Sequence, residues 1–147
     1  MRIKERRMKI LIMGLPGAGK THLAERLHKH LACAWYNADR IREMANDWDF
    51  SQEARQRQAM RMRNIADFEC NQGRTVICDF VCPTKITRTL FKPNVIIWLD
   101  TIQAGRFEDT NRVFEKPESV DHHITRHMTD EEILEFAECL KLVKNDT

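Results

Sequence analysis

The sequence predicts an α/β fold, a three-layer α/β/α sandwich built on a parallel sheet of about five strands. Short apolar runs alternate with segments of helical periodicity along the 147 residues, a pattern typical of such sheets. The first apolar run leads directly into Gly14–Thr21, which has the G-x-x-x-x-G-K-T spacing of a Walker A phosphate-binding loop. Together these observations predict a P-loop NTPase fold of the nucleotide-kinase type. The length suits one domain, residues 1–147.

The residue types of the loop explain its expected chemistry. Glycines permit a left-handed backbone that turns successive N–H groups onto phosphate oxygens. Lys20 is long enough to reach the β and γ phosphates, and Thr21 offers a hydroxyl to Mg²⁺. We therefore expect ATP and Mg²⁺ as cofactors. The residues expected here to contact ATP are Gly14, Leu15, Pro16, Gly17, Ala18, Gly19, Lys20, Thr21 and His22.

The other elements follow from periodicity and from breaking residues. Apolar residues at helical spacing predict a helix over 20–31, directly after the loop. The strands expected after it span 32–36, 75–80, 95–100 and 121–125. The further helices are expected over 40–46, over 51–73 with Ser51 as N-cap, in a short piece within 83–93, and over 131–144.

Two acids follow or end these strands. In open α/β sheets, groups that contact ligands lie at the carboxyl ends of the strands. Asp39 comes just after the second strand, and Asp79 lies near the end of the third, where it resembles a Walker B aspartate. Both carboxylates are expected to join Thr21 in holding Mg²⁺, directly or through water.

The long helix over 51–73 is rich in arginine. Arg57 and Arg61 are one turn apart, whereas Arg55 lies with Gln58 on a neighbouring stripe. For most of these arginines we expect a solvated face.

The polar segment 103–117 has no clear period and is expected to be a mobile lid. Gly105 is its candidate hinge. Arg106 and Arg112 are the cations expected to close onto the ATP phosphates during transfer.

The composition of the sequence limits which kinds of partner and binding site are expected. A net charge of +2 forces no nucleic-acid partner, and no apolar run approaches the roughly 18 to 20 residues that span a bilayer. Five cysteines without a C-x-x-C pair argue against a disulfide framework and a zinc site, and His123 and His127 have no third ligand nearby in the sequence. We expect a cytoplasmic protein with a small-molecule substrate and no membrane; self-association as a homodimer is left open.

Several stretches resemble the adenylylsulfate kinase family, whose members phosphorylate the 3′-hydroxyl of adenylylsulfate with ATP. The family's loop, usually G-L-S-G-S-G-K-S/T, is similar to Gly14–Thr21, and its L-D-G-D-N-(I/V)-R segment aligns with Tyr36–Arg42. Its G-F-S followed by D-R-x-x-N and a further arginine aligns with 49–51, 54–58 and Arg61. The family's I-S-P and Y-E-x-P elements align with 81–83 and 114–117.

The resemblance implies roles residue by residue. Asp39 falls on the family's catalytic acid, beside Mg²⁺ and the accepting hydroxyl, and Lys20 would act with it in catalysis. The residues that the resemblance assigns to the nucleotide substrate are Arg42, Arg55, Phe50 and Gln58. The arginines would grip its anionic part, and Phe50 would stack on its adenine; Gln58 replaces an asparagine of the family.

The sequence departs from the family at three places. Asn37 stands where the family has the first acid of D-G-D, and Cys82 replaces the serine of I-S-P. The lid is shortened and lacks the K-G-L-Y and F-T-G-I-D elements that supply a second stacking aromatic. Phe114 is the aromatic expected to replace it, covering the base of the acceptor opposite Phe50.

Three functions compete on this sequence. The leading one is an adenylylsulfate kinase with a compact lid. The second is a P-loop kinase for another nucleotide, a nucleoside or a small hydroxyl substrate. The third is a nucleotide-binding module without catalysis, against which the joint presence of Lys20, Thr21 and Asp39 argues.

Overall fold

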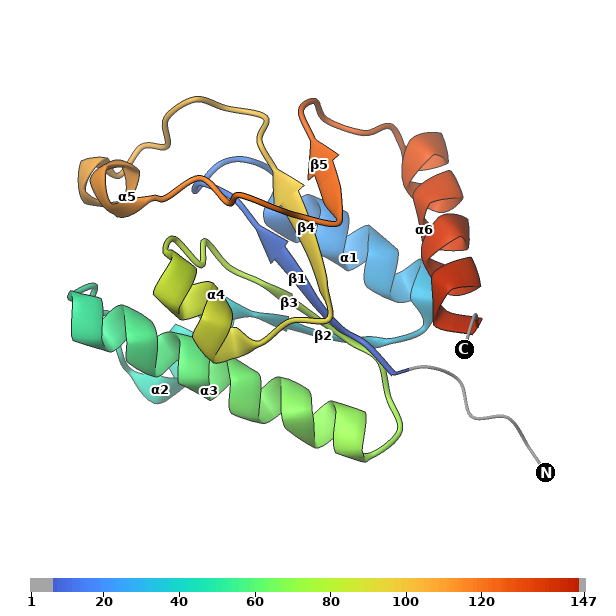
Figure 1. Cartoon of the computed structure of the whole chain (residues 1–147), viewed down its shortest axis with the longest axis horizontal. Helices are drawn as coiled ribbons and strands as arrows, with labels where there is room; N and C mark the ends of the chain where they lie inside the picture. Colours follow the sequence, from blue (N-terminus) through green and yellow to red (C-terminus); the bar gives the residue numbers. More distant parts are fainter. Residues whose placement is uncertain (1–6, 146–147) are drawn as a thin grey trace.

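The computed structural model describes residues 7–145 and contains a five-stranded sheet between two helical layers (Figure 1). The strands are β1 (Lys9–Met13), β2 (Ala34–Asn37), β3 (Val76–Asp79), β4 (Val95–Leu99) and β5 (His122–Ile124). The helices are α1 (Lys20–Leu31), α2 (Ala38–Ala45), α3 (Gln52–Asn71), α4 (Lys85–Phe91), α5 (Glu108–Val113) and α6 (Asp130–Asn145). Segments 1–6 and 146–147, which belong to the expected 1–147 domain, lie outside the described residues.

The sheet has the strand order β2-β3-β1-β4-β5, and every neighbouring pair is parallel. Central β1 and β3 are buried at every position, as strands covered by helices on both faces must be, whereas edge strand β2 is only half-buried. The predicted fold class, a three-layer sandwich on a parallel P-loop sheet, is therefore confirmed. All five strands point their carboxyl ends toward one edge of the sheet, where the Walker A loop and the acids lie.

Each face of the sheet carries its own apolar layer. On one face α1 and α6 pack side by side, and α1 buries Leu23, Ala24, Leu27 and Leu31 at the predicted helical spacing (Figure 1). On the other face α3 and α4 pack against the sheet, with Met62 of α3 and Phe91 of α4 fully buried. The two layers fix the ends of β1, β2 and β3 relative to one another. No helix of the described chain is long and apolar enough to cross a membrane.

Several strand and helix ends shift by one or two residues from the sequence prediction, and three differences have an identifiable local cause. Ala32 is not in β2 but ends α1 in the left-handed conformation. Helix α2 begins two residues earlier than expected, because the side chain of Asn37 accepts a hydrogen bond from the backbone N–H of Arg40 and caps it. The segment 103–117 contains a short helix, α5, which its six residues are too few to reveal by periodicity.

Candidate functional site

The Walker A loop joins β1 to α1 in the expected geometry. Gly14 passes so close to β4 that an added Cβ would lie 2.5 Å from the carbonyl oxygen of Leu99. Gly19 caps α1 with φ of 99°, a left-handed conformation that favours glycine. The loop therefore turns tightly and directs the N-terminus of α1 at a cavity, as a phosphate site requires.

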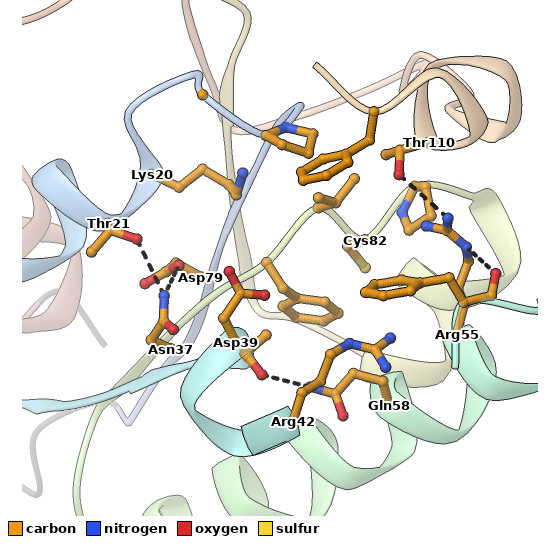
Figure 2. Close-up of a pocket in the computed structure, with 18 of the residues that line it drawn as sticks. Lys20, Thr21, Asn37, Asp39, Arg42, Arg55, Gln58, Asp79, Cys82 and Thr110 are labelled. Carbon is orange, nitrogen blue, oxygen red and sulfur yellow. Dashed lines mark hydrogen bonds between the residues drawn. The ribbon is translucent and has the colours of Figure 1, made fainter. Parts of the chain in front are cut away.

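A cavity of about 720 Å³ opens beside this loop (Figure 2). Pro16, Gly17, Gly19, Lys20, Thr21 and His22 line it on the loop side. Asn37, Asp39, Arg42, Phe50, Arg55, Gln58, Asp79 and Arg106 also line it. Of the other expected ATP contacts, Leu15 and Ala18 are buried beneath the loop and Gly14 lies against β4. Most of the predicted site residues thus share one cavity, although they come from distant parts of the chain.

Asn37 connects the acid of β3 to the hydroxyl of the loop. Its Nδ2 donates to Asp79 Oδ1 at 2.9 Å and to Thr21 Oγ1 at 3.2 Å. The second oxygen of Asp79 accepts from Nε1 of Trp35 at 2.6 Å. Burial raises the pKa of Asp79 above its usual value, while these two donors and Lys20 act in the opposite direction. The oxygens of Thr21 and Asp79 therefore converge on one point.

Lys20 is the charged group at the centre of the cavity. Burial lowers its pKa from 10.5 to about 8, and the charges of Asp79 and Asp39 oppose that lowering. Its Nζ donates to the carbonyl oxygen of Leu15 at 3.1 Å. Asp39 lies in the first turn of α2, where the helix N-terminus favours a carboxylate. Figure 2 shows Lys20, Asp39 and Asp79 facing the same space.

The opposite wall of the cavity carries an aromatic ring with two guanidinium groups close to it. Cζ of Arg42 lies 4.4 Å from the centre of the Phe50 ring, and Cζ of Arg55 lies 5.4 Å from it. Arg55 Nη2 also donates to Oγ1 of Thr110, a buried residue of α5, at 3.3 Å. Burial lowers the pKa of both arginines from their ordinary value. This wall combines an aromatic face with two partly desolvated positive charges.

Gln58 lines the same wall, but its amide already has partners. Its Nε2 donates to the carbonyl oxygen of Ala38 at 3.0 Å, and its Oε1 accepts from Arg61 Nη1. The side chain thus joins α3 to the start of α2. Gln58 therefore holds α2 and α3 together at this wall, in addition to lining the cavity.

The structure corrects two expectations for the lid segment. Phe114 does not line the main cavity: its ring lies 5.5 Å from Cζ of Arg88 and is partly buried against the core. Phe107, half-exposed at 53%, lines the cavity in its place. Arg112 does not line the main cavity either, and its guanidinium pairs with Asp109, a lining residue one turn back on α5. Phe107 and Phe114 lie at opposite ends of α5, and of these two rings it is Phe107 that lines the main cavity.

Cys82 lines the cavity where the related family has a serine. Burial raises the pKa of its thiol to about 12, so the group is neutral at physiological pH. Its backbone has φ of 46°, and its carbonyl oxygen accepts from Arg88 Nε at 3.0 Å. Cys82 is thus an apolar part of the wall. No disulfide joins any of the described cysteines.

Several cavity residues were not predicted from the sequence. Trp48, Phe80, Thr87, Phe107, Asp109 and Thr110 also line it. The aromatics gave a weak signal, because Trp48 stands two residues before Phe50 in a polar segment. Nothing local marked Thr110, whose place depends on the fold of α5.

Comparison with known proteins agrees with this geometry. A family model described as an AAA domain matches residues 10–91, more than half of the chain. A probable adenylyl-sulfate kinase from Aeropyrum pernix is 33% identical over 97 residues, which are 60% of this chain and 51% of that protein. The chain therefore spans about half the length of this curated relative.

Solved structures show the same fold. The APS kinase of Mycobacterium tuberculosis in complex with AMPPNP and APS aligns with a TM-score of 0.76, 18% identity, and coverage of 96% of this chain and 99% of that chain. An unliganded sugar kinase from Janibacter sp. aligns with a TM-score of 0.68, 18% identity and coverage of 95% of both chains. The shared feature is the fold of P-loop kinases.

Proposed function

Because the chain belongs to the AAA-domain family of P-loop proteins and is similar to an adenylyl-sulfate kinase, we propose that it transfers phosphate from ATP to the 3′-hydroxyl of adenylylsulfate. One observation carries the proposal: a single cavity has the Walker A loop on one side and the Arg42–Phe50–Arg55 stack on the other. The loop side suits a triphosphate, and the stack suits a nucleotide, with a planar base for the ring and an anionic group for the arginines. A phosphoryl donor and a nucleotide acceptor would thus meet between them.

Lys20 and Asp39 are the proposed catalytic residues. The ammonium group of Lys20, which lines the cavity beside the loop, would neutralise charge on the transferring phosphate. Asp39 accepts the proton of the attacking hydroxyl group. As this happens, the oxygen of the hydroxyl group bonds to the γ-phosphorus and the bond between that phosphorus and ADP breaks. The exposed position of Asp39 at the start of α2 leaves its carboxylate open to the cavity.

The residues at this site fit Mg²⁺. Mg²⁺ in kinase sites takes one or two carboxylates together with substrate phosphates and water. Thr21 Oγ1 and Asp79 Oδ1 lie 3.2 Å and 2.9 Å from the same nitrogen of Asn37, and Asp39 lines the cavity beside them. These three residues would hold the ion, which when bound supplies charge neutralisation for the phosphates.

The acceptor would lie against Phe50, with its anionic part toward Arg42 and Arg55. Stacking on an aromatic ring favours any base, and the guanidinium groups favour phosphate or sulfate. Phe107 supplies a second aromatic surface from the segment 103–117, which we propose as the lid, with Arg106 reaching the ATP phosphates. The alternative acceptors are another nucleotide, a nucleoside or a small hydroxyl compound on the same fold.

A coupled assay of ADP release tests the proposal. The parent protein is given ATP, Mg²⁺ and one acceptor at a time: adenylylsulfate, adenosine 5′-monophosphate, adenosine or a neutral sugar. Adenylylsulfate should give the highest kcat/KM, and adenosine, which lacks the anion, should lose most of it. A higher kcat/KM with the neutral sugar would contradict the assignment of the acceptor but leave that of a kinase. No ADP release with any acceptor would favour the non-catalytic module.

A further inference from the structure

The six residues between α2 and α3, 46–51, contribute Trp48 and Phe50 to the cavity lining and contain two acids. Asp47 is nearly buried, with 11% of its side chain exposed, whereas 58% of the Asp49 side chain is exposed. Phe50, which lines the cavity, follows them directly. The conformation of this short loop therefore decides where that ring stands.

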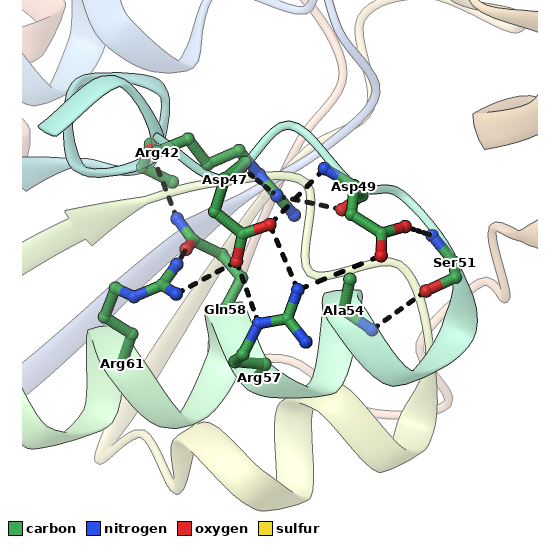
Figure 3. A network of polar contacts seen from close by, with 9 residues as sticks. Arg42, Asp47, Asp49, Ser51, Ala54, Arg57, Gln58 and Arg61 are labelled. Atoms are coloured by element: carbon green, nitrogen blue, oxygen red, sulfur yellow. Dashed lines mark hydrogen bonds and ion pairs between the residues drawn. The ribbon is translucent and has the colours of Figure 1, made fainter. Parts of the chain in front are cut away.

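Asp47 ties the loop to α3 (Figure 3). Its carboxylate accepts from Arg57 Nε at 2.9 Å and Nη2 at 3.1 Å, a bidentate pair. The same carboxylate accepts from Arg61 Nη2 at 2.9 Å. These contacts hold the pKa of the Asp47 carboxyl well below its usual range. Arg57 and Arg61 thus anchor the loop instead of facing solvent unpaired.

The backbone of the same loop holds Arg42. Nη1 of Arg42 donates to the carbonyl oxygens of Asp47, at 2.9 Å, and Asp49, at 3.1 Å. The Arg42 guanidinium, which is almost fully buried, stacks on Phe50 at 4.4 Å. A change in the loop therefore moves a guanidinium group and a ring of the acceptor wall together.

The negative charge of Asp47 offsets the positive charges of the arginines at this wall of the cavity. The positive charges of Arg55 and Arg61 lower the pKa of Arg42, because they disfavour its charged form. The negative charge of Asp47 acts in the opposite direction. Without a carboxylate at position 47, Arg57 and Arg61 lose the group that accepts hydrogen bonds from both of them, and Arg42 keeps the favourable charge of Asp39 but not that of Asp47. Separation of the loop from α3 would relieve the repulsion between the arginines.

We propose that Asp47 is a positioning residue for the phosphoryl acceptor: it clamps loop 46–51 onto Arg57 and Arg61 so that Arg42 and Phe50 present a preformed anion and base site. The proposal rests on the proposed function in one respect, that the acceptor is an anion bound at this wall. Asp47 does not line the cavity, so it acts through Arg42 and Phe50.

The test compares Asp47→Asn with Asp49→Asn. Both variants remove one negative charge from the same loop. Only the first removes the carboxylate that accepts hydrogen bonds from Arg57 and Arg61, because Asp49 lies 3.9 Å from Arg57 Nη2 and accepts no hydrogen bond from it. Asp47→Asn should raise the KM for adenylylsulfate ~10-fold or more, with kcat and the KM for ATP within ~2-fold of the parent, as expected when a charged hydrogen-bonded site is lost. Asp49→Asn should leave all three constants within ~2-fold.

A double-mutant cycle asks whether Asp47 acts through Arg42. Asp47→Asn combined with Arg42→Ala should raise the acceptor KM by clearly less than the product of the two single effects, because one of the two groups being positioned is already gone. Effects that multiply would overturn the proposal. So would an unchanged acceptor KM in Asp47→Asn, an equal rise in Asp49→Asn, or a joint loss of kcat and ATP affinity. Should Asp47→Asn not fold, Arg57→Gln is the alternative variant, because it removes only the half-exposed partner of Asp47. It should raise the KM for adenylylsulfate by a smaller factor, again with kcat and the KM for ATP unchanged.

A second measurement separates failure of this proposal from failure of the proposed function. If the parent protein neither binds nor phosphorylates adenylylsulfate, the acceptor assignment is wrong, and hydrogen exchange of residues 44–50 then tests the clamp directly. Exchange should be faster in Asp47→Asn than in the parent and unchanged in Asp49→Asn. Equal exchange in the parent and Asp47→Asn would overturn the clamp whatever the substrate.

Discussion

Replacing Lys20 by methionine should abolish phosphoryl transfer and yet stabilise the protein in the absence of ligands. Burial lowers the Lys20 pKa from 10.5 to about 8, and each pKa unit corresponds to about 1.4 kcal/mol, so the charged group costs the native state roughly 3 kcal/mol at pH 7. The hydrogen bond to the carbonyl of Leu15 returns about 1 kcal/mol. Methionine removes both, which leaves a gain in the free energy of unfolding of about 2 kcal/mol.

The pH dependence of this gain follows from the direction of the shift. Below about pH 8 both the native and the unfolded state carry the proton, and the full cost is present. Between about pH 8 and 10.5 the native state releases its proton first, so the parent becomes more stable as pH rises. The advantage of Lys20→Met should therefore be constant up to about pH 8 and shrink above it.

Urea unfolding at several pH values, without nucleotide or Mg²⁺, measures this difference. Lys29→Met is the matched control, since 67% of the Lys29 side chain is exposed and its pairing with Glu25 lies on the surface. Its stability should stay within about 0.5 kcal/mol of the parent. A Lys20→Met protein that is less stable than the parent at pH 7, or that keeps its advantage at pH 10, refutes the reasoning; preserved turnover refutes the catalytic role.

Three further predictions concern the cavity. Asp39→Asn should lower kcat ~100-fold or more with little change in the KM for ATP, measured by steady-state kinetics, because an amide cannot accept the hydroxyl proton; lost ATP affinity with spared kcat would make Asp39 structural. Arg42→Ala and Arg55→Ala should each raise the acceptor KM ~10-fold or more, and unchanged values in both would exclude this anion site. Phe107→Ala should weaken nucleotide acceptors roughly 5- to 150-fold in titration calorimetry, whereas Phe114→Ala should lower thermal stability and spare binding; the reverse pattern would restore Phe114 to the acceptor site.

The fold was largely predictable, because its signals are local. The Walker A spacing, the buried runs around Val76–Asp79 and Val95–Leu99, and the periodicity of α1 each depend on a few adjacent residues. Errors occurred where tertiary context decides a boundary. The apolar Ala32 suits a strand, but the end of α1 requires a left-handed residue there. Asn37 begins α2 early because its side chain finds the Arg40 N–H, which no apolar pattern records.

The site was predictable only in part, because it joins residues that are far apart in sequence. Motif alignment placed Arg42 and Arg55 correctly on one wall, since both flank the same loop. It failed for Phe114, because distance along a lid segment says nothing about which side of α5 a residue faces; Phe107 and Thr110, three residues apart, share the face toward the cavity. The arginines of α3 were expected to be solvated, and their partner Asp47 lies 10 and 14 residues away in another element.

Asn37, the departure from the related family that stands nearest the reacting groups, has a physical rationale. A carboxylate at this position would place a third acid beside Asp79 and Asp39, and the buried Asp79 already has a pKa raised by desolvation. An amide instead donates to Asp79 and Thr21 through Nδ2 while its oxygen caps α2. The helix that carries Asp39 is thereby joined to the hydroxyl and carboxylate of the proposed metal site by one side chain. With an amide in place of a carboxylate at position 37, fewer negative charges oppose the effect of burial on Lys20. This agrees with the lowered pKa of its ammonium group.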